Sequence, residues 1–417
     1  MNPTRSLSRR FFLASMGALP AARLLRAEAY LSSEKPIPFP EGAARGLAKA
    51  EDYLLTPGLV YLQTASLGPT PRPVMDRAFA AWKELEQNPV VYGYRIHELA
   101  MDEVQAKAAA FLGCKNGELV LTQSTTSGMH AVAQGLGLRA GDRVLTTDQE
   151  HPGGRWCWDY LARKHGVILD GVVIPPGEND PQAIVERFKK ALTPKTKVLS
   201  FCHLLSSTGL RMPVAELSAL ARAHDALAVV DGAQATGGID VNVKALGCHV
   251  YVTSGHKWML GPKGTGLLYI SEDSDRRVDL IALQNGRNAY TDAVGVINIP
   301  GVLAFGAAID YLNAIGIRKI EAHNLGLRNQ LHEMLRALPK LPIASPPPGP
   351  LASPLLACRL PDALESRALM MRLLEKHQVV VKMVPKNWFN GIRFSTHLFN
   401  SVGDLERAVE GVRVELG

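Results

Sequence analysis

The stretch from Val229 to Gly266 reads VVDGAQATGGIDVNVKALGCHVYVTSGHKWMLGPKGTG, and it decides the expected fold. Asp231 closes the apolar run LAVVD, and Lys257 follows the second run HVYVTS after a short turn. Such apolar runs are typical of buried strands in a parallel sheet. Because ligands bind outside the carboxyl ends of these strands, we expect the carboxylate and the amine to face one crevice.

Outside this stretch, apolar runs alternate with segments of helical periodicity. Strands are predicted at 60–63, 119–122, 143–147, 167–174, 197–201, 227–230, 249–253 and 266–270, and helices at 98–112, 128–137, 154–165, 181–192, 214–225 and 301–315. The alternation predicts an α/β protein with a mostly parallel sheet that helices cover on both faces. We predict four regions: a signal peptide (1–29), a linker (30–57), a large domain (58–289) and a small C-terminal domain (290–417).

Composition excludes several classes of protein. With 417 residues, 47% of them hydrophobic, the chain can bury a large core. The first 29 residues account for +4 of the formal charge of +7, so the remainder gives no support to a nucleic-acid partner. The five cysteines contain no C-x-x-C pair, which suggests neither a metal site nor a disulfide framework.

The N-terminus has the pattern of an export signal. Arg9 and Arg10 precede an apolar run from Phe11 to Ala22, and Ala27-Glu28-Ala29 has the form of a cleavage site. The run is too short to span a bilayer. The paired arginines resemble a twin-arginine (Tat) signal, so we expect a periplasmic protein with no membrane association once the signal is removed. The alternative is an amphipathic N-terminal helix of the fold.

An aspartate and a lysine that face one crevice suit pyridoxal 5'-phosphate. The amine of Lys257 would form a Schiff base with the aldehyde, and Asp231 would keep the ring nitrogen protonated. The segment from Gln123 to Gly128 lies between a strand and a helix, where backbone N–H groups can hold a phosphate. Thr125 and Thr126 are its expected ligands, although a Ser/Thr run before a helix is also an ordinary N-cap.

These residues resemble the class V aminotransferase and cysteine desulfurase group of fold-type I enzymes. The segment from Ser254 to Lys257, with GPKGTG after it, is similar to the group's Schiff-base segment, and Asp231 to Gln234 to its pyridinium-binding strand end. The resemblance runs from about residue 58 to the C-terminus. It implies a large domain with a mostly parallel seven-stranded sheet, a smaller α/β C-terminal domain and a homodimer.

The resemblance also implies further roles in the site. His151 would stack on the pyridine ring, Ser206 and Gln234 would bond its 3-hydroxyl, and Arg393 would bind the substrate carboxylate. Ser254 and His256 would add donors to the phosphate. His151 could instead be an ordinary loop histidine. Tyr92, Tyr94 and Arg95 are candidates for the substrate side or for plain aromatic packing.

Two departures from the group narrow the function. The desulfurases carry a nucleophilic cysteine shortly before the arginine, where this chain has KMVPKNWFNG at 382–391, and Cys358 lies in a predicted strand. Val296 stands where relatives have a threonine that reaches the partner subunit's phosphate. The motifs are most similar to the isopenicillin N epimerase-like branch. We therefore expect a class V aminotransferase-like enzyme for an amino acid or amine-bearing metabolite, with an epimerase, a C–S lyase or a non-catalytic cofactor-binding protein as alternatives.

Overall fold

The computed structural model describes residues 44–417, with the backbone alone at residues 44, 275 and 276. These residues belong to one compact unit. The predicted signal peptide and the first half of the predicted linker, residues 30–43, lie outside the described residues. The boundary near residue 290 stays a prediction.

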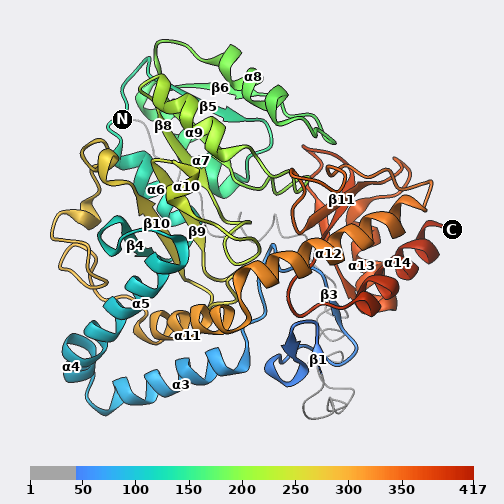
Figure 1. Ribbon diagram of the computed structural model, residues 1–417, viewed down its shortest axis with the longest axis horizontal. Helices are drawn as coiled ribbons and strands as arrows, with labels where there is room; N and C mark the ends of the chain where they lie inside the picture. Colours follow the sequence, from blue (N-terminus) through green and yellow to red (C-terminus); the bar gives the residue numbers. More distant parts are fainter. Residues whose placement is uncertain (1–43) are drawn as a thin grey trace, which may run out of the picture. The chain divides into compact units, whose positions relative to one another are not determined.

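A seven-stranded sheet forms the centre of the fold (Figure 1). Its strands are β4 (Leu119–Thr122), β5 (Arg143–Thr147), β6 (Ile168–Val172), β7 (Thr196–Cys202), β8 (Leu227–Asp231), β9 (Val250–Ser254) and β10 (Gly266–Ile270), in the spatial order β4-β10-β9-β8-β7-β5-β6. Only β10 runs antiparallel to its neighbours, because the short GPKGTG turn returns the chain beside β9. The expected mostly parallel sheet of seven strands is confirmed.

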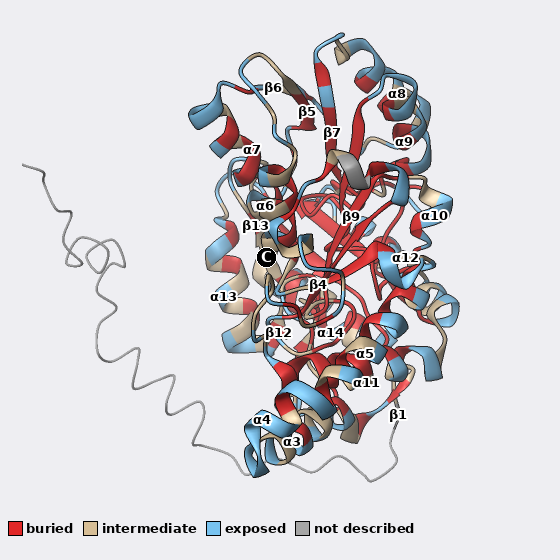
Figure 2. Ribbon diagram, turned by 90° about the vertical axis from the view of Figure 1, so that its left-hand side faces the viewer, coloured by how far each residue is buried: buried red, intermediate tan, exposed pale blue. Residues whose placement is uncertain are grey.

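Helices cover both faces of this sheet, which explains its buried strands (Figure 2). On one face, α6 (Thr125–Gly135) and α7 (Pro152–His165) pack against Val144, Val229 and Val252. On the other face lie α5 (His97–Leu112), α8 (Pro181–Ala191), α9 (Val214–Ala223) and α11 (Ile299–Ile315). Successive strand residues point to opposite faces, so a strand covered on both sides is apolar throughout.

The C-terminal part has its own antiparallel sheet, in the order β11-β14-β13. Its strands are β11 (Leu355–Arg359), β13 (Lys382–Val384) and β14 (Gly391–Ser395), and its helices are α12 (Ile317–Arg336), α13 (Ser366–His377) and α14 (Val402–Leu416). A parallel pair, β3 (Val60–Tyr61) with β12 (Val379–Val380), joins the start of the described chain to this part. Together they enclose a second apolar core.

Two details depart from the predicted elements. Helix α3 (Arg72–Gln87) had not been expected. Helix α6 begins at Thr125 rather than at residue 128, because Ser124 and Ser127 form a capping box.

Within residues 44–417 no single helix is long and apolar enough to cross a membrane. Helices α11 and α12 meet that criterion only as a pair, with a bend of 75° between them.

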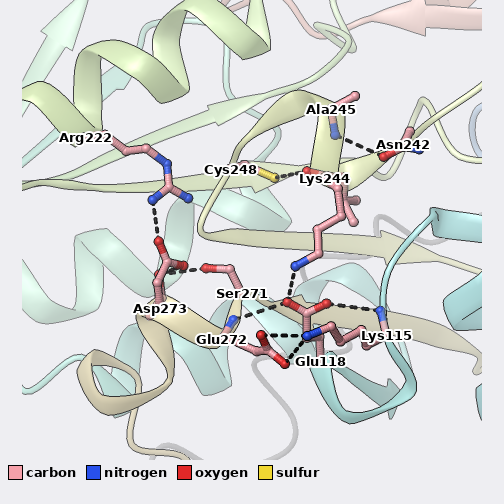
Figure 3. Close-up of polar contacts among 12 residues, drawn as sticks. Lys115, Glu118, Arg222, Asn242, Lys244, Ala245, Cys248, Ser271, Glu272 and Asp273 are labelled. Carbon is pink, nitrogen blue, oxygen red and sulfur yellow. Dashed lines mark hydrogen bonds and ion pairs between the residues drawn. The ribbon is translucent and has the colours of Figure 1, made fainter.

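A buried carboxylate ties the edge of the large sheet to neighbouring loops (Figure 3). Glu118, which is 1% exposed, precedes β4 and pairs with the ammonium group of Lys244. It also accepts hydrogen bonds from the backbone N–H groups of Lys115 (3.0 Å) and Glu272 (3.2 Å). Burial acts to raise the pKa of Glu118, but these donors outweigh it and leave the pKa below its ordinary value.

Candidate active site

A cavity of about 360 Å³ opens where the parallel strands end. The residues that the sequence assigned to catalysis, cofactor binding or the substrate carboxylate all line it: Thr125, Thr126, His151, Ser206, Asp231, Gln234, Ser254, His256, Lys257 and Arg393. They come from loops that follow five different strands and from β14, so only the folded chain brings them together. Their individual roles stay predictions.

Asp231 is the last residue of β8, and its side chain is 5% exposed. One carboxylate oxygen, Oδ1, accepts a hydrogen bond from the N–H of Ala233 at 2.9 Å. The other, Oδ2, faces the first turn of α7, where a Cβ at Gly154 would lie only 2.6 Å away. Burial raises the pKa of Asp231, and the nearby Lys257 ammonium opposes the rise.

Lys257 lies in the turn between β9 and β10. Burial lowers the pKa of its amine, the negative charge of Asp231 acts in the opposite direction, and Arg393 lowers it further. The turn is held by a segment far away in the sequence, since the N–H of Gly68 donates to the carbonyl of His256 at 2.9 Å. A Cβ at Gly68 would lie 2.0 Å from the carbonyl oxygen of Lys257, so only glycine allows this approach.

The N-terminus of α6 forms one wall of the cavity. Ser254 holds it in place, because its hydroxyl accepts from the N–H of Thr125 at 3.2 Å and lies 2.8 Å from the Thr125 hydroxyl. The hydroxyl of Thr126 is exposed and lies over Gly153, where a Cβ would be 2.5 Å away. His256 adds a ring nitrogen, Nδ1, that is buried and has no partner among residues 44–417.

His151 caps α7 at the mouth of the cavity. Its Nδ1 accepts a hydrogen bond from the N–H of Gly153 at 3.1 Å, which leaves the proton of a neutral ring on Nε2. Packing of the ring against the wall, together with the cations Lys257, Arg393 and Lys382, lowers the pKa of His151 to about 4. A neutral imidazole is suited to stack on an aromatic ring.

The side chains of Gln234 and Ser206 differ in how many hydrogen bonds they already make to the protein. The amide of Gln234 donates to the carbonyl of Ala65 and accepts from the indole of Trp258, both at 2.9 Å, so one N–H is left for a ligand. The Ser206 hydroxyl has no hydrogen bond to any described residue. Its carbonyl accepts from Arg393, which is 5% exposed and has a buried Nε without a partner among the described residues.

Several residues of the site were missed by sequence reasoning. Ala65 and Ser66 follow the predicted strand at 60–63 and carry no motif, yet they line the cavity. Lys382 and Trp388 line the substrate side, from the segment that had been noted only for its lack of cysteine. Glu150 lies behind Asp231, where its carboxylate contacts Cys202 Sγ at 2.9 Å and Thr147 Oγ1 at 2.6 Å.

Other nominated residues lie outside the cavity of this chain. Tyr92, Tyr94 and Arg95 do not line it, and Tyr94 packs edge-on against Tyr290 with ring centroids 5.4 Å apart. Val296 is 66% exposed. Cys358 lies in β11 as expected and is fully buried. Among the described residues, no group of His, Cys, Asp and Glu side chains is arranged to hold a metal ion.

The cavity fits pyridoxal phosphate at both ends. The N-terminus of α6, the Thr126 hydroxyl and the unpartnered Nδ1 of His256 suit a phosphate group. At the opposite end, Asp231 offers a buried carboxylate to a protonated ring nitrogen, and Gly154 leaves room beside it. Lys257 lines the cavity near Asp231, whereas Lys263 of the same motif does not line it, so the aldehyde and the ring nitrogen of the cofactor each have a partner.

Comparison with known proteins supports this interpretation. The sequence model of the family described as "Aminotransferase class-V" matches residues 60–407, which include every residue that lines the cavity. Isopenicillin N epimerase from Amycolatopsis lactamdurans is 30% identical over 385 residues, or 87% of this chain and 96% of the relative. A probable cysteine desulfurase from Methanothermobacter thermautotrophicus is 32% identical over 301 residues, or 67% of this chain and 73% of the relative. The apo structure of a cysteine desulfurase from Thermococcus onnurineus NA1 matches with a TM-score of 0.76 and 27% identity, covering 88% of this chain and 96% of that one.

Proposed function

Because the chain belongs to the class V aminotransferase family, we propose that it acts at the α-carbon of an amino acid or an amine-bearing metabolite. Enzymes of this family depend on pyridoxal phosphate, and this chain is one of them. The observation that carries the proposal is the meeting of Lys257, Asp231 and Arg393 in one cavity, with an amine, a buried carboxylate and a buried guanidinium.

Each of these residues has a definite task. When bound, pyridoxal phosphate supplies an aldehyde for an amine and a ring that accepts the electron pair left at the α-carbon. Asp231 holds the proton on the ring nitrogen, and Arg393 orients the substrate through its carboxylate. Lys257 would hold the cofactor through its amine and would serve as the base that moves the α-proton. Its lowered pKa leaves more of the amine unprotonated, as a base requires.

The absorption spectrum of the purified protein tests this assignment. The native protein should show the visible band of lysine-bound cofactor, and Lys257→Ala should lose it. Lys263→Ala is the matched control, because Lys263 follows in the same turn and instead donates to the carbonyl of Gly68 at 2.9 Å. An unchanged visible band in Lys257→Ala would refute the proposed Schiff-base lysine.

Epimerisation is the second candidate reaction. It is favoured by the similarity to an isopenicillin N epimerase over nearly the whole of both chains. Persulfide chemistry is not favoured, since no cysteine lines the described cavity. Incubation with single enantiomers separates the reactions: a keto acid and the pyridoxamine form of the cofactor indicate transamination, and mixed enantiomers indicate epimerisation. Release of a thiol from a thioether substrate, or of a persulfide from a disulfide substrate, indicates a C–S lyase.

We also propose that the enzyme is a homodimer. Large apolar side chains are exposed on α3, on the segment that follows it and on a nearby loop: Phe79, Trp82, Val90, Tyr94, Leu99 and Val296. Exposed apolar groups of this size often mark an interface. Sedimentation equilibrium should give twice the mass of the chain, and Trp82→Glu should shift the protein toward monomer.

Export by the twin-arginine route is a separate proposal, based on residues 1–29. Tat exports folded proteins, which suits an enzyme that acquires its cofactor in the cytoplasm. Replacing both Arg9 and Arg10 by Lys should leave the full-length precursor in the cytoplasmic fraction. Continued appearance of the doubly substituted protein in the periplasm would exclude this route.

A further inference from the structure

A second cation lies beside Arg393 on the substrate side of the cavity. Lys382 of β13 is the direct cross-strand partner of Arg393 in β14. Directly opposed residues in an antiparallel pair project to the same face, and both side chains line the cavity. The substrate side therefore presents two adjacent positive charges.

Neither charge is neutralised by the described part of the chain. The hydrogen bond of Arg393 goes to the neutral carbonyl of Ser206, and its Nε is buried without a partner there. The ammonium group of Lys382 has neither an ion pair nor a hydrogen bond within residues 44–417. Asp231 is the sole carboxylate among the described residues that line the cavity, and it is the group assigned to the ring nitrogen of the cofactor.

Two opposed cations are unfavourable unless an anion joins them. Like charges placed directly opposite each other destabilise a sheet. Burial lowers the pKa of Lys382, and the charge of Arg393 lowers it further; burial lowers the pKa of Arg393 to about 10. A single substrate carboxylate fills the bidentate fork of the arginine, which leaves Lys382 available for another anionic group.

The wall beside these cations is apolar. Met383, Val384, Pro385 and Trp388 line the cavity next to Lys382. Such a wall suits an aliphatic segment between two charged ends, because it offers contact surface without competing polar groups.

We propose that the substrate is an amino acid with a second anionic group, whose α-carboxylate binds Arg393 and whose side-chain carboxylate binds Lys382. The assignment rests on the proposed function and specifies its substrate class. It makes Lys382 a specificity-determining residue: loss of its charge weakens binding of dicarboxylic amino acids and spares neutral ones.

Titration of the holoenzyme with matched amino acids tests the assignment through the change in the visible absorption of the cofactor. Aspartate and glutamate, as both enantiomers, are compared with asparagine and glutamine. The native protein should bind the better acidic member about tenfold or more tightly than its amide. Lys382→Met should abolish this preference, and Lys382→Arg should retain it.

The control variant is Lys386→Met. Lys386 follows in the same segment, its side chain is 72% exposed, and it lies 3.7 Å from Glu365, so its loss should leave the preference unchanged. Equal binding of glutamate and glutamine by the native protein would overturn the proposal. So would an equal loss for both in Lys382→Met, because both cations would then hold the same α-carboxylate.

Ligands without an amine separate this inference from the proposed function. Succinate and glutarate should raise the melting temperature of the holoenzyme more than butyrate and pentanoate do, and Lys382→Met should remove the difference. A protein that prefers the diacids but shows no spectral change with any amine supports the two-cation site and contradicts the proposed chemistry. Spectral changes with amines, without a preference for acidic ones, would support the proposed chemistry and contradict the two-cation site.

Discussion

At the scale of single residues, the site depends on a few buried charges whose surroundings set their protonation. Asp231, at the end of β8, is kept beside Lys257 with little solvent. Burial raises the pKa of Asp231 and lowers that of Lys257, because it disfavours both charged forms. The charge of each residue acts against this effect on the other. The bound cofactor would place a cationic ring nitrogen beside the carboxylate, which compensates for its desolvation.

Asp231→Asn removes the charge but keeps the shape of the side chain. We expect the variant to retain the visible band of lysine-bound cofactor and to lose about 100-fold or more of kcat/KM, since an amide does not hold the ring proton. Steady-state kinetics on whichever amine proves active gives the measurement. Asp240→Asn, an exposed change nine residues away, is the control. Full activity of Asp231→Asn would rule out the assigned role.

Glu150 makes the stability of the fold depend on pH. Burial raises its pKa to about 7, Asp231 raises it too, and the contacts with Cys202 and Thr147 oppose the rise. A carboxyl with a folded-state pKa above the ordinary 4.5 stays protonated in the fold, so stability falls as pH rises from about 4.5 to 7. The contribution is up to about 3 kcal/mol.

Glu150→Gln should remove that loss, because a neutral amide has no proton to release. The free energy of unfolding in urea, compared at pH 5 and pH 8, should fall with pH in the native protein and fall less in the variant. Glu216→Gln, at an exposed position of α9, should behave like the native protein. An identical pH dependence in Glu150→Gln would contradict the raised pKa.

At the scale of elements, helix termini and turns hold these charges in place. The first turn of α7 approaches Asp231 so closely that a Cβ at Gly154 would lie 2.6 Å from Oδ2. Gly154→Ala must therefore displace either the carboxylate or the helix. We expect weaker cofactor binding and a shifted visible band, measured by titrating apoprotein with pyridoxal phosphate. Gly171→Ala, which meets no atom within 4 Å, should bind the cofactor normally.

The network around Glu118 belongs to the same scale, because it joins the start of β4 to helix α10 (Val243–Leu246) and to Glu272, which follows β10 (Figure 3). Its pKa is lowered in the fold, so its stabilisation is complete above the ordinary value of 4.5 and is lost as pH falls through the folded-state pKa. Glu118→Gln should reduce the free energy of unfolding at pH 7 by about 1–3 kcal/mol. The difference in the free energy of unfolding between the variant and the native protein should become smaller toward pH 3.

At the scale of the whole molecule, the prediction concerns the partner subunit. The resemblance to the class V group implies a threonine at position 296 that would reach the phosphate in the partner subunit of the proposed dimer, whereas this chain has Val296, which is 66% exposed. Val296→Thr should bind pyridoxal phosphate about tenfold more tightly, since one hydrogen bond to an anion is restored. Val414→Thr, exposed on α14, is the control. No gain in affinity would show that position 296 does not reach the cofactor.

The strands were predictable because local sequence specifies them. The runs at 119–122, 143–147 and 266–270 were assigned with their observed bounds, since strands buried on both faces are continuously apolar. Helix α3 was missed although its sequence has helical periodicity, with Val74 and Ala81 buried and Phe79 and Trp82 on its exposed face.

The sequence by itself determined the sheet and the motif residues Asp231, Lys257 and Arg393, because strand burial and short turns are local and each motif is continuous. Only the tertiary structure decided what surrounds them. Gly68 under the lysine turn and Lys382 opposite Arg393 are brought in by contacts between segments distant in sequence or by strand register. No local pattern encodes such contacts, since they arise when separate elements pack together.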